Sequence, residues 1–225
     1  MGKILKVISL CVCAIAASLL LALKDIQPSH APVPAGNHAI RTAIDSANDH
    51  LVDTAVSMLR SGYLVLRMGI GADSRLLARF NQKNKSYSHC GIVMIEGGKP
   101  WVYHAIGGED NPDERLRRDP AQLFFSPKHN SALAVVRYDL DDHQLRELRK
   151  VVIGYYAQKP RFDLKFDLTT DDKLYCAEFV YKALNKATGD SGYIHPTSAA
   201  GITYVGTDDL FVNRHAGIVW QTAFK

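Results

Sequence analysis

The sequence is poor in cysteine, with four among 225 residues. Cys11 and Cys13 lie in an apolar segment near the N-terminus, so the rest of the chain carries only Cys90 and Cys176. Two cysteines are too few for a disulfide framework, although one disulfide between them is conceivable in an oxidising compartment. No Cys-x-x-Cys is present, and the spacing matches no zinc motif. The sequence predicts neither a bound metal nor a cofactor.

Long runs of one charge and internal repeats are also absent. The formal net charge is +4, and basic residues are scattered among acidic ones, which argues against a nucleic-acid partner. The short cluster Arg115, Arg117 and Arg118 is expected to form a solvated face. Apolar residues make up 47% and charged residues 22%, as in ordinary globular proteins.

The first 25 residues differ from the rest and predict a signal peptide or membrane anchor. Lys3 and Lys6 precede an uncharged, mostly apolar run of 17 residues, 7–23, close to the minimum of about 17–25 for a membrane span. Good Ala-x-Ala cleavage sites are missing, which favours an uncleaved anchor over a cleaved peptide. Residues 26–37 predict a proline-rich linker and 38–225 the main domain. We expect an exported, cell-envelope protein, either anchored in the inner membrane facing the periplasm or secreted after cleavage.

Cys176 opens a strong helical pattern. Phe179, Val180, Ala183 and Leu184 recur at three- and four-residue intervals from it, and Thr169-Thr170-Asp171-Asp172 upstream suggests an acidic N-cap. A thiol at a helix N-terminus is favoured as the thiolate, which lowers its pKa. Packing remains the structural alternative, because buried cysteines are common in protein cores.

A predicted hairpin supplies two histidines. Residues 88–95 and 101–106 resemble strands, and the Gly97-Gly98 turn between them suits a primed turn in which Glu96 faces Lys99. In that register His89 and His104 lie on the same face as diagonal neighbours, about 7–8 Å apart. Cys90 then falls on the opposite face.

The remaining pattern predicts an α+β domain. Helices are expected over 38–60 and from Asp141-Asp142 to Pro160, and strands over 63–68, 131–140 and 217–224. A polar loop with a short helix is expected over 111–126, and a largely turn-like segment over 189–206. The loops around Gly107 to Ser126 and Gly189 to Gly206 are expected to form the substrate pocket.

Together these residues predict nucleophilic chemistry. Cys176 is the expected nucleophile, His89 the base that takes its proton, and His104 the group that fixes the tautomer of His89. The backbone N–H of Cys176 is a candidate oxyanion donor. The same residues in purely structural roles remain about equally well supported by the sequence.

Two segments carry a resemblance to a family. Tyr87-Ser88-His89-Cys90-Gly91-Ile92-Val93 and Leu174-Tyr175-Cys176-Ala177-Glu178-Phe179-Val180 resemble the histidine strand and cysteine helix of the permuted NlpC-type papain-like cysteine hydrolases, the YiiX/YaeF/YebB group. The group is similar in arrangement to lecithin retinol acyltransferase. The likeness runs over 61–184.

The resemblance implies a circularly permuted papain-like fold, with an antiparallel sheet packed against helices. It makes Cys176 the nucleophile, His89 the base and His104 the third polar residue. Ala177 stands where the family often has serine. Tyr63 stands where its opening strand usually has aspartate, so no role of that aspartate transfers to this chain.

The leading hypothesis is a cell-envelope thiol hydrolase that cleaves an amide bond, for example in cell-wall peptides, through a cysteine acyl-enzyme. The alternatives are a lipid acyl hydrolase or acyltransferase, and a non-catalytic envelope binding domain. The expected partners are a peptide, acyl-amide or lipid substrate and the membrane. Redox pairing of Cys90 with Cys176 is disfavoured, because Cys90 is expected to point away from the His89 face.

Overall fold

The computed structural model describes residues 35–107, 111, 113–199 and 201–225. The chain divides into two units, Met1–Thr42 and Ala43–Lys225. The described residues of the first unit form the opening turns of helix α2 (Ala35–Ser57). The predicted signal or anchor, 1–25, lies outside the described residues, as does most of the predicted linker. Within the described part of the chain, no helix is both long and apolar enough to cross a bilayer.

Helix α2 begins earlier than the sequence predicts, because residues 35–37 of the predicted linker are helical. Pro34 is the last proline of that segment. A proline disfavours helix at the residue before it but not after it, and Ala35 has high helix propensity. Helix α2 therefore begins at Ala35, directly after the last proline.

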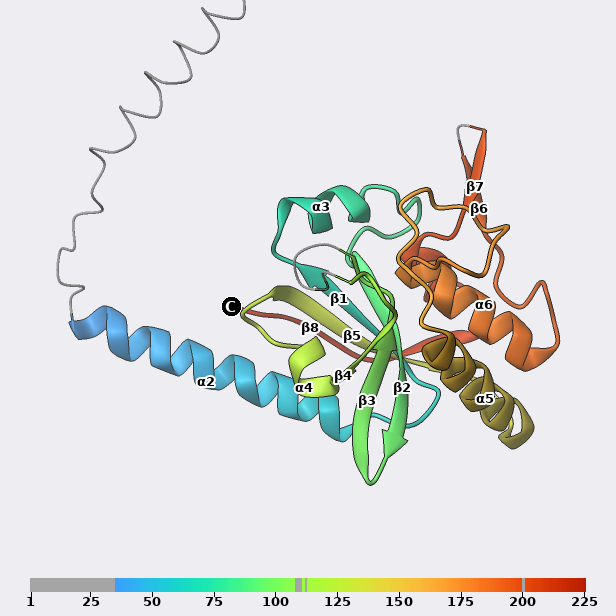
Figure 1. Ribbon diagram of the computed structural model, residues 1–225. Helices are drawn as coiled ribbons and strands as arrows, with labels where there is room; N and C mark the ends of the chain where they lie inside the picture. The colour runs from blue at the N-terminus through green and yellow to red at the C-terminus, as the bar shows by residue number, and fades with distance from the viewer. Residues whose placement is uncertain (1–34, 108–110, 112, 200) are drawn as a thin grey trace, which may run out of the picture. The chain divides into compact units, whose positions relative to one another are not determined.

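A six-stranded antiparallel sheet, in the order β4-β3-β2-β1-β5-β8, organises the second unit (Figure 1). Its strands are β1 (Leu64–Gly69), β2 (His89–Glu96), β3 (Lys99–His104), β4 (Arg117–Pro120), β5 (Asn130–Tyr138) and β8 (Ala216–Ala223). Strands β6 (Thr197–Ala199) and β7 (Ile202–Tyr204) form a separate hairpin. The predicted α+β class with an antiparallel sheet and helices is confirmed.

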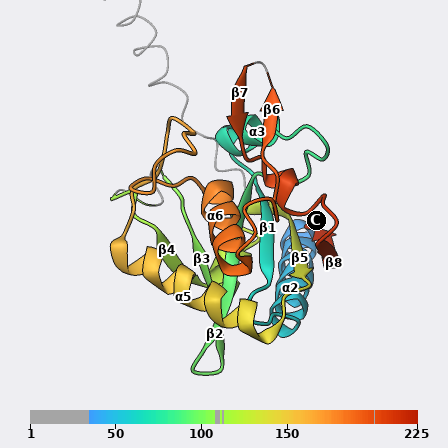
Figure 2. The same ribbon diagram turned by 90° about the vertical axis from the view of Figure 1, so that its right-hand side faces the viewer.

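Each face of the large sheet has its own apolar core. Helices α5 (Asp142–Gln158) and α6 (Cys176–Thr188) cover one face, which Figure 2 shows towards the viewer. Residues of α2 and of the short helix α4 (Ala121–Phe124) pack on the other. The alternation of β1 decides which side chain joins which core, since Leu64 and Leu66 face α6 whereas Val65 faces α2. Helix α3 (Ala72–Ala78) and the 3-10 helix η1 (Thr207–Leu210) complete the described helices.

The β2–β3 hairpin has the register that the sequence predicts. Glu96 pairs with Lys99 and Ile92 with Tyr103. Gly97 and Gly98 have φ angles of 55° and 74°, which a primed turn requires and which glycine adopts without steric cost. The register puts His89 and His104 on the α4 side of the sheet.

Helices α5 and α6 also begin where the sequence predicts, although the cap of α6 is different. Asp141 caps α5 by accepting the Gln144 N–H at 2.8 Å. The predicted acidic cap of α6 is wrong: Tyr175 occupies the N-cap position, and Glu178 accepts its N–H at 3.1 Å. Asp171 instead pairs with lysines of α6, because its carboxylate lies beside the helix and not at its end.

Two short elements depart from the predicted loops. Strand β4 lies in the predicted loop and pairs with β3, and the β6–β7 hairpin lies in the segment predicted as turn-like. Strands of three or four residues are too short to show a period, and β4 is charged instead of alternating with apolar residues.

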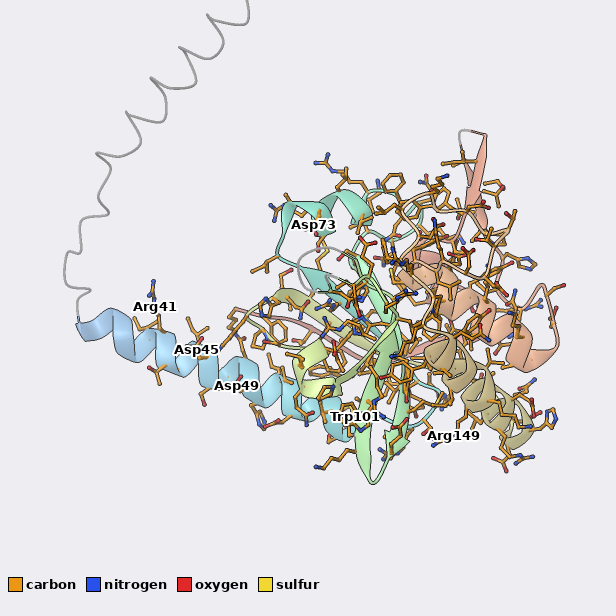
Figure 3. The ribbon with its side chains drawn as sticks, in the orientation of Figure 1. Arg41, Asp45, Asp49, Asp73, Trp101 and Arg149 are labelled. Atoms are coloured by element: carbon orange, nitrogen blue, oxygen red, sulfur yellow. The ribbon has the colours of Figure 1, made fainter. Side chains whose placement is uncertain are left out.

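Two arginines of the predicted cluster have defined partners on the sheet. The Arg118 guanidinium lies 4.3 Å from the ring centre of Trp101, labelled in Figure 3, and pairs with Glu96 at 2.6 Å. Arg117 pairs with Asp119 at 2.9 Å. Their side chains are 28% and 33% exposed, so they remain partly solvated, and the β3–β4 pairing gives them these ion-pair partners on the sheet.

Candidate active site

Cys176 is the first residue of α6, and its environment favours the thiolate. Hydrogen bonding from the Cys90 thiol lowers the pKa of Cys176, opposed by burial and assisted by the backbone N–H groups of Ala177 and Cys90 and by the charge of Arg67. Burial and the neighbouring Cys176 sulfur raise the pKa of Cys90. In this pair Cys176 is thus the sulfur that ionises and Cys90 the one that keeps its proton.

The contact between Cys90 and Cys176 corrects one step of the sequence argument. Cys90 does lie on the opposite face from His89, as predicted, since it packs in the α6-side core. Cys176 however belongs to the same core, because α6 covers that face. The reason for disfavouring a Cys90–Cys176 pairing is therefore wrong. Both cysteines are free thiols in this structure.

The predicted histidine pair extends into a chain of three side chains. His89 Nε2 lies 2.9 Å from His104 Nδ1, and His104 Nε2 lies 3.0 Å from Asp119 Oδ2. Asp119 also accepts from Arg117 at 2.9 Å. Both rings are buried and pack against Phe124, which holds their planes. The three side chains form a relay from β2 through β3 to β4.

The relay assigns the ring protons. Burial alone would raise the pKa of Asp119, but hydrogen bonds and charges from His104 and Arg117 hold it below its usual range, so the carboxylate only accepts. His104 Nε2 must then donate to Asp119, which leaves His104 Nδ1 as the acceptor in the neutral ring. His89 Nε2 therefore carries the proton donated to His104. The lone pair of the neutral His89 ring is then on Nδ1.

Burial keeps both rings neutral. It lowers the pKa of His89 well below 6.5, and the positive charge of Arg67 and the neighbouring His104 add to this effect. Burial also lowers the pKa of His104, against the opposing influence of Asp119. A neutral imidazole near pH 7 can accept a proton, so the relay is in the protonation state of a general base.

Arg67 links the two halves of the site. It pairs with His89 across β1 and β2, and its guanidinium lies 4.8 Å from the ring centre of Phe124. Its charge acts on His89, His104 and Cys176 alike. The sequence analysis did not single out Arg67. The pairing of β1 with β2, which puts Arg67 opposite His89, was the feature that could have indicated it.

No hydrogen bond is recorded between the side chains of His89 and Cys176. The ring of His89 bonds to His104 on the α4 side of the sheet, whereas Cys176 packs with Cys90 in the core on the α6 side. Because Cys90 follows His89 in β2, the two candidate groups lie on opposite faces of the sheet at the start of that strand. Catalytic hydrogen bonds are often formed only when substrate is bound.

Cys176 lies in the wall of a cavity of about 460 Å³. Aromatic and aliphatic side chains dominate its lining, with Lys165, Asp167 and the Ser88 hydroxyl among the polar groups. Its apolar walls are formed by Leu77, Phe80, Phe162, Phe166, Leu168, Tyr204 and Val205. A hydrogen bond of 2.7 Å from the Val205 N–H to the Tyr175 hydroxyl ties the cavity to the start of α6.

The predicted substrate loops are only partly correct. Of 189–206, residues 202–206 line the Cys176 cavity, but the segment 162–169 contributes more and was not predicted. The other loop contributes Arg117, Asp119, Leu123 and Phe124 to a second, smaller cavity of about 160 Å³ that also contains His104. One cavity therefore borders the candidate nucleophile Cys176, and the other borders His104 and Asp119 of the relay.

Asp119 is the main functional candidate that sequence reasoning missed. It lies opposite Val102 in the β3–β4 register and shares a face with His104. Only the pairing of β4 with β3 brings it there, and its charged surroundings concealed the strand. Among the described residues, no group of three or more His, Cys, Asp or Glu side chains is arranged to hold a metal ion.

Comparison with known proteins supports the same fold class. No family model matches the chain. It is homologous to the uncharacterized protein YiiX of Escherichia coli (strain K12), with 29% identity over 105 residues, 46% of this chain and 47% of YiiX. The chain thus spans about half the length of the curated relative it matches.

A solved structure is similar over a longer stretch. The crystal structure of metalloprotein YiiX from Escherichia coli O157:H7 superposes with a TM-score of 0.58 and 19% identity, covering 73% of this chain and 98% of that chain. Identity at this level supports a shared fold and leaves the chemistry to be argued from this chain's own residues.

Proposed function

We propose that the protein is a thiol hydrolase of the permuted NlpC-type papain-like class, which cleaves an amide bond through an acyl-enzyme on Cys176. The observation that carries this proposal is the position of Cys176. It begins a helix, lines a cavity, has a lowered pKa and interacts with Cys90, the residue that follows His89 of the neutral His89–His104–Asp119 relay in β2. A helix N-terminus and a nearby imidazole base are what an activated thiol requires.

The reaction follows from these roles. His89 Nδ1 accepts the Cys176 proton, and the sulfur attacks the substrate carbonyl carbon. The C–N bond breaks, the amine leaves with the proton from His89, and a thioester remains on Cys176. Water, deprotonated by His89, then releases the acid and restores the thiol. The N–H groups at the start of α6 have no intrahelical acceptor and are candidate oxyanion donors.

A permuted papain-like arrangement is part of the proposal. The order supports it, since the histidine strand β2 precedes the cysteine helix α6 in the chain. The proposal places the protein in the cell envelope, held by residues 1–25 or released after their cleavage. Peptides, including those of the cell wall, are the first substrates to test.

A metal is not part of the mechanism. The description of the similar crystal structure as a metalloprotein applies to that protein. In the described part of this chain, no group of three or more His, Cys, Asp or Glu side chains is arranged to hold a metal ion. His89 and His104 direct nitrogens at each other, and Asp119 is engaged by His104 and Arg117.

The test is turnover of panels of cell-wall peptides and acyl amides by the wild-type chain and by Cys176→Ala. We expect activity in the wild type and its loss in the variant. Equal turnover by both proteins would sink the hydrolase proposal. Alkylation separates it from a non-catalytic binding domain, because an activated Cys176 reacts at neutral pH much faster than an ordinary thiol.

A second candidate function is acyl hydrolysis or acyl transfer on a lipid. The apolar lining of the cavity beside Cys176 favours it, since an acyl chain buries apolar surface there. Mass spectrometry of the Cys176 peptide after short incubation with lipid esters would identify a trapped acyl group. Ile202→Asp, in the cavity wall, should reduce trapping of long chains, whereas Ile218→Asp on the exposed face of β8 should not.

A further inference from the structure

Cys90 and Cys176 are the only cysteines among the described residues, and they contact each other. Cys90 lies on β2 and Cys176 on α6, and both belong to the core between the sheet and that helix. In the proposed hydrolysis Cys90 only helps to lower the pKa of Cys176 and takes no part in the bonds that form and break. A second thiol beside the nucleophile can also react with it.

The two sulfurs differ in access. Cys176 is 8% exposed and borders the cavity of about 460 Å³, whereas Cys90 is 0% exposed and does not line that cavity. A reagent that enters the cavity therefore meets Cys176 first. Cys90 lies behind it in the core between β2 and α6, and its thiol interacts with the Cys176 sulfur. In this arrangement Cys176 is the thiol that reacts with an incoming reagent, and Cys90 is the thiol that can then react with Cys176.

We propose that Cys90 and Cys176 form a redox pair in which a hydroperoxide oxidises Cys176 and Cys90 resolves the product to an intramolecular disulfide. The disulfide itself does not depend on the proposed hydrolase function. Its consequence, reversible inactivation of the nucleophile, rests on that function.

The chemistry balances in two steps. The Cys176 sulfur attacks one peroxide oxygen, the O–O bond breaks, and the departing oxygen takes up a proton as an alcohol, or as water when the oxidant is hydrogen peroxide. Cys176 is then a sulfenic acid, two electrons more oxidised. The Cys90 sulfur attacks Cys176 Sγ, the S–O bond breaks, and hydroxide leaves with the Cys90 proton as water. A dithiol reductant reverses the change by thiol–disulfide exchange.

Contact between the sulfurs gives the pair a protective role. A sulfenic acid that is not resolved proceeds to the sulfinic acid, which is irreversible for most proteins. A thiol already in contact intercepts the sulfenic acid without movement of α6 away from β2. Cys90 thus keeps oxidation of Cys176 recoverable.

The experiment uses the reduced full chain with a molar excess of hydrogen peroxide, because the sulfinic acid needs a second peroxide after the sulfenic acid, followed by alkylation of free thiols and peptide mapping without reduction. We expect a Cys90–Cys176 linked peptide in the wild type that disappears on treatment with dithiothreitol. In Cys90→Ser the linked peptide is absent, and sulfinic acid at Cys176 rises several-fold over the wild type. Peptide mapping also separates this link from any involving Cys11 or Cys13.

Wild-type protein in which Cys176 becomes sulfinic acid while Cys90 stays alkylatable would overturn the pair. So would a disulfide that joins two copies of the chain. Cys90→Ala, with circular dichroism and a melting curve, provides a second folded variant if serine is not tolerated in the core.

The hydrolase proposal and the redox-pair proposal can each be refuted without refuting the other. Mapping needs no substrate, so absence of hydrolysis leaves the redox result intact. A chain that turns over substrate but forms no Cys90–Cys176 disulfide would sink the redox pair alone. When both hold, peroxide-treated enzyme loses turnover and dithiothreitol restores it, whereas turnover by Cys90→Ser after the same treatment is not restored.

Discussion

His89 and His104 are joined by a hydrogen bond of 2.9 Å between Nε2 and Nδ1, across the hairpin of β2 and β3. Because Asp119 holds the other nitrogen of His104 at 3.0 Å, the bond has one direction in the neutral pair. His89 donates, and its Nδ1 remains the basic nitrogen. The relay therefore prepares a base on the strand that carries Cys90, next to the residue that contacts Cys176.

Replacing the base should abolish most of the chemistry. His89→Ala is expected to lower kcat by about 10²–10⁴-fold, the usual contribution of general acid–base catalysis. KM should change little, because His89 does not line the Cys176 cavity. Steady-state kinetics against His143→Ala, an exposed histidine on α5, checks the result. Equal loss in both variants would contradict the assigned role.

Asp119 should act as a positioning residue through His104. Asp119→Asn removes the fixed acceptor, and an amide can present its NH₂ to His104 Nε2, which reverses the direction of the relay. We expect kcat to fall about tenfold or more and KM to stay within about twofold, as expected when a tautomer is disturbed. Nitrogen-resolved NMR of labelled histidines should show altered tautomer populations for His89.

The matched control is Asp139→Asn. Asp139 is an exposed carboxylate paired with Arg137 at 3.3 Å, distant from the relay in the chain. Its replacement should leave both the kinetics and the histidine spectra unchanged. Loss of protein stability alone in Asp119→Asn, with normal kcat in the folded fraction, would refute the positioning role.

The pH profile should reflect the buried base. Burial, followed by the charge of Arg67, lowers the pKa of His89 below 6.5, so the acidic limb of kcat/KM is expected below pH 6.5. Arg67→Gln removes the repulsion that disfavours the protonated ring. The limb should therefore move to higher pH, as should the midpoint of Cys176 alkylation, since Arg67 also stabilises that thiolate. A limb that moves to lower pH would contradict the electrostatic assignment.

Glu178 should make the stability of the protein pH-dependent. Its side chain is fully buried at the start of α6, and burial raises its pKa to about 7 despite a contact of 2.9 Å with Lys182. Lys182 stays charged because Asp171 also pairs with it. The folded state thus binds the Glu178 proton more tightly than the unfolded state, whose pKa is about 4.3.

The free energy of unfolding is expected to fall as pH rises from about 4.5 to 7, because the unfolded chain releases this proton first. The pKa rises by about 2.7 units, from about 4.3 to about 7, and one unit corresponds to about 1.4 kcal/mol, so the change is at most about 4 kcal/mol. Urea unfolding at several pH values should show this slope in the wild type and in Glu147→Gln, a surface control on α5. Glu178→Gln should lose it.

Local rules determined a large part of the site. Gly97 and Gly98 set the turn, the turn set the register, and strand alternation then put His89 and His104 on one face. The apolar period fixed the start of α6 at Cys176. These features depend on residues a few positions apart, so the sequence alone predicts them.

Only the tertiary structure decided which partners meet. Packing of α6 over β2 brought Cys176 to Cys90, pairing of β4 with β3 brought Asp119 to His104, and the segment 162–169 folded over Cys176 to line the cavity. Each of these contacts joins two elements that lie far apart in the sequence. The residue pattern of one element does not indicate which other element it packs against. The energy that selects them comes from burying whole faces of helix and sheet, which no local period encodes.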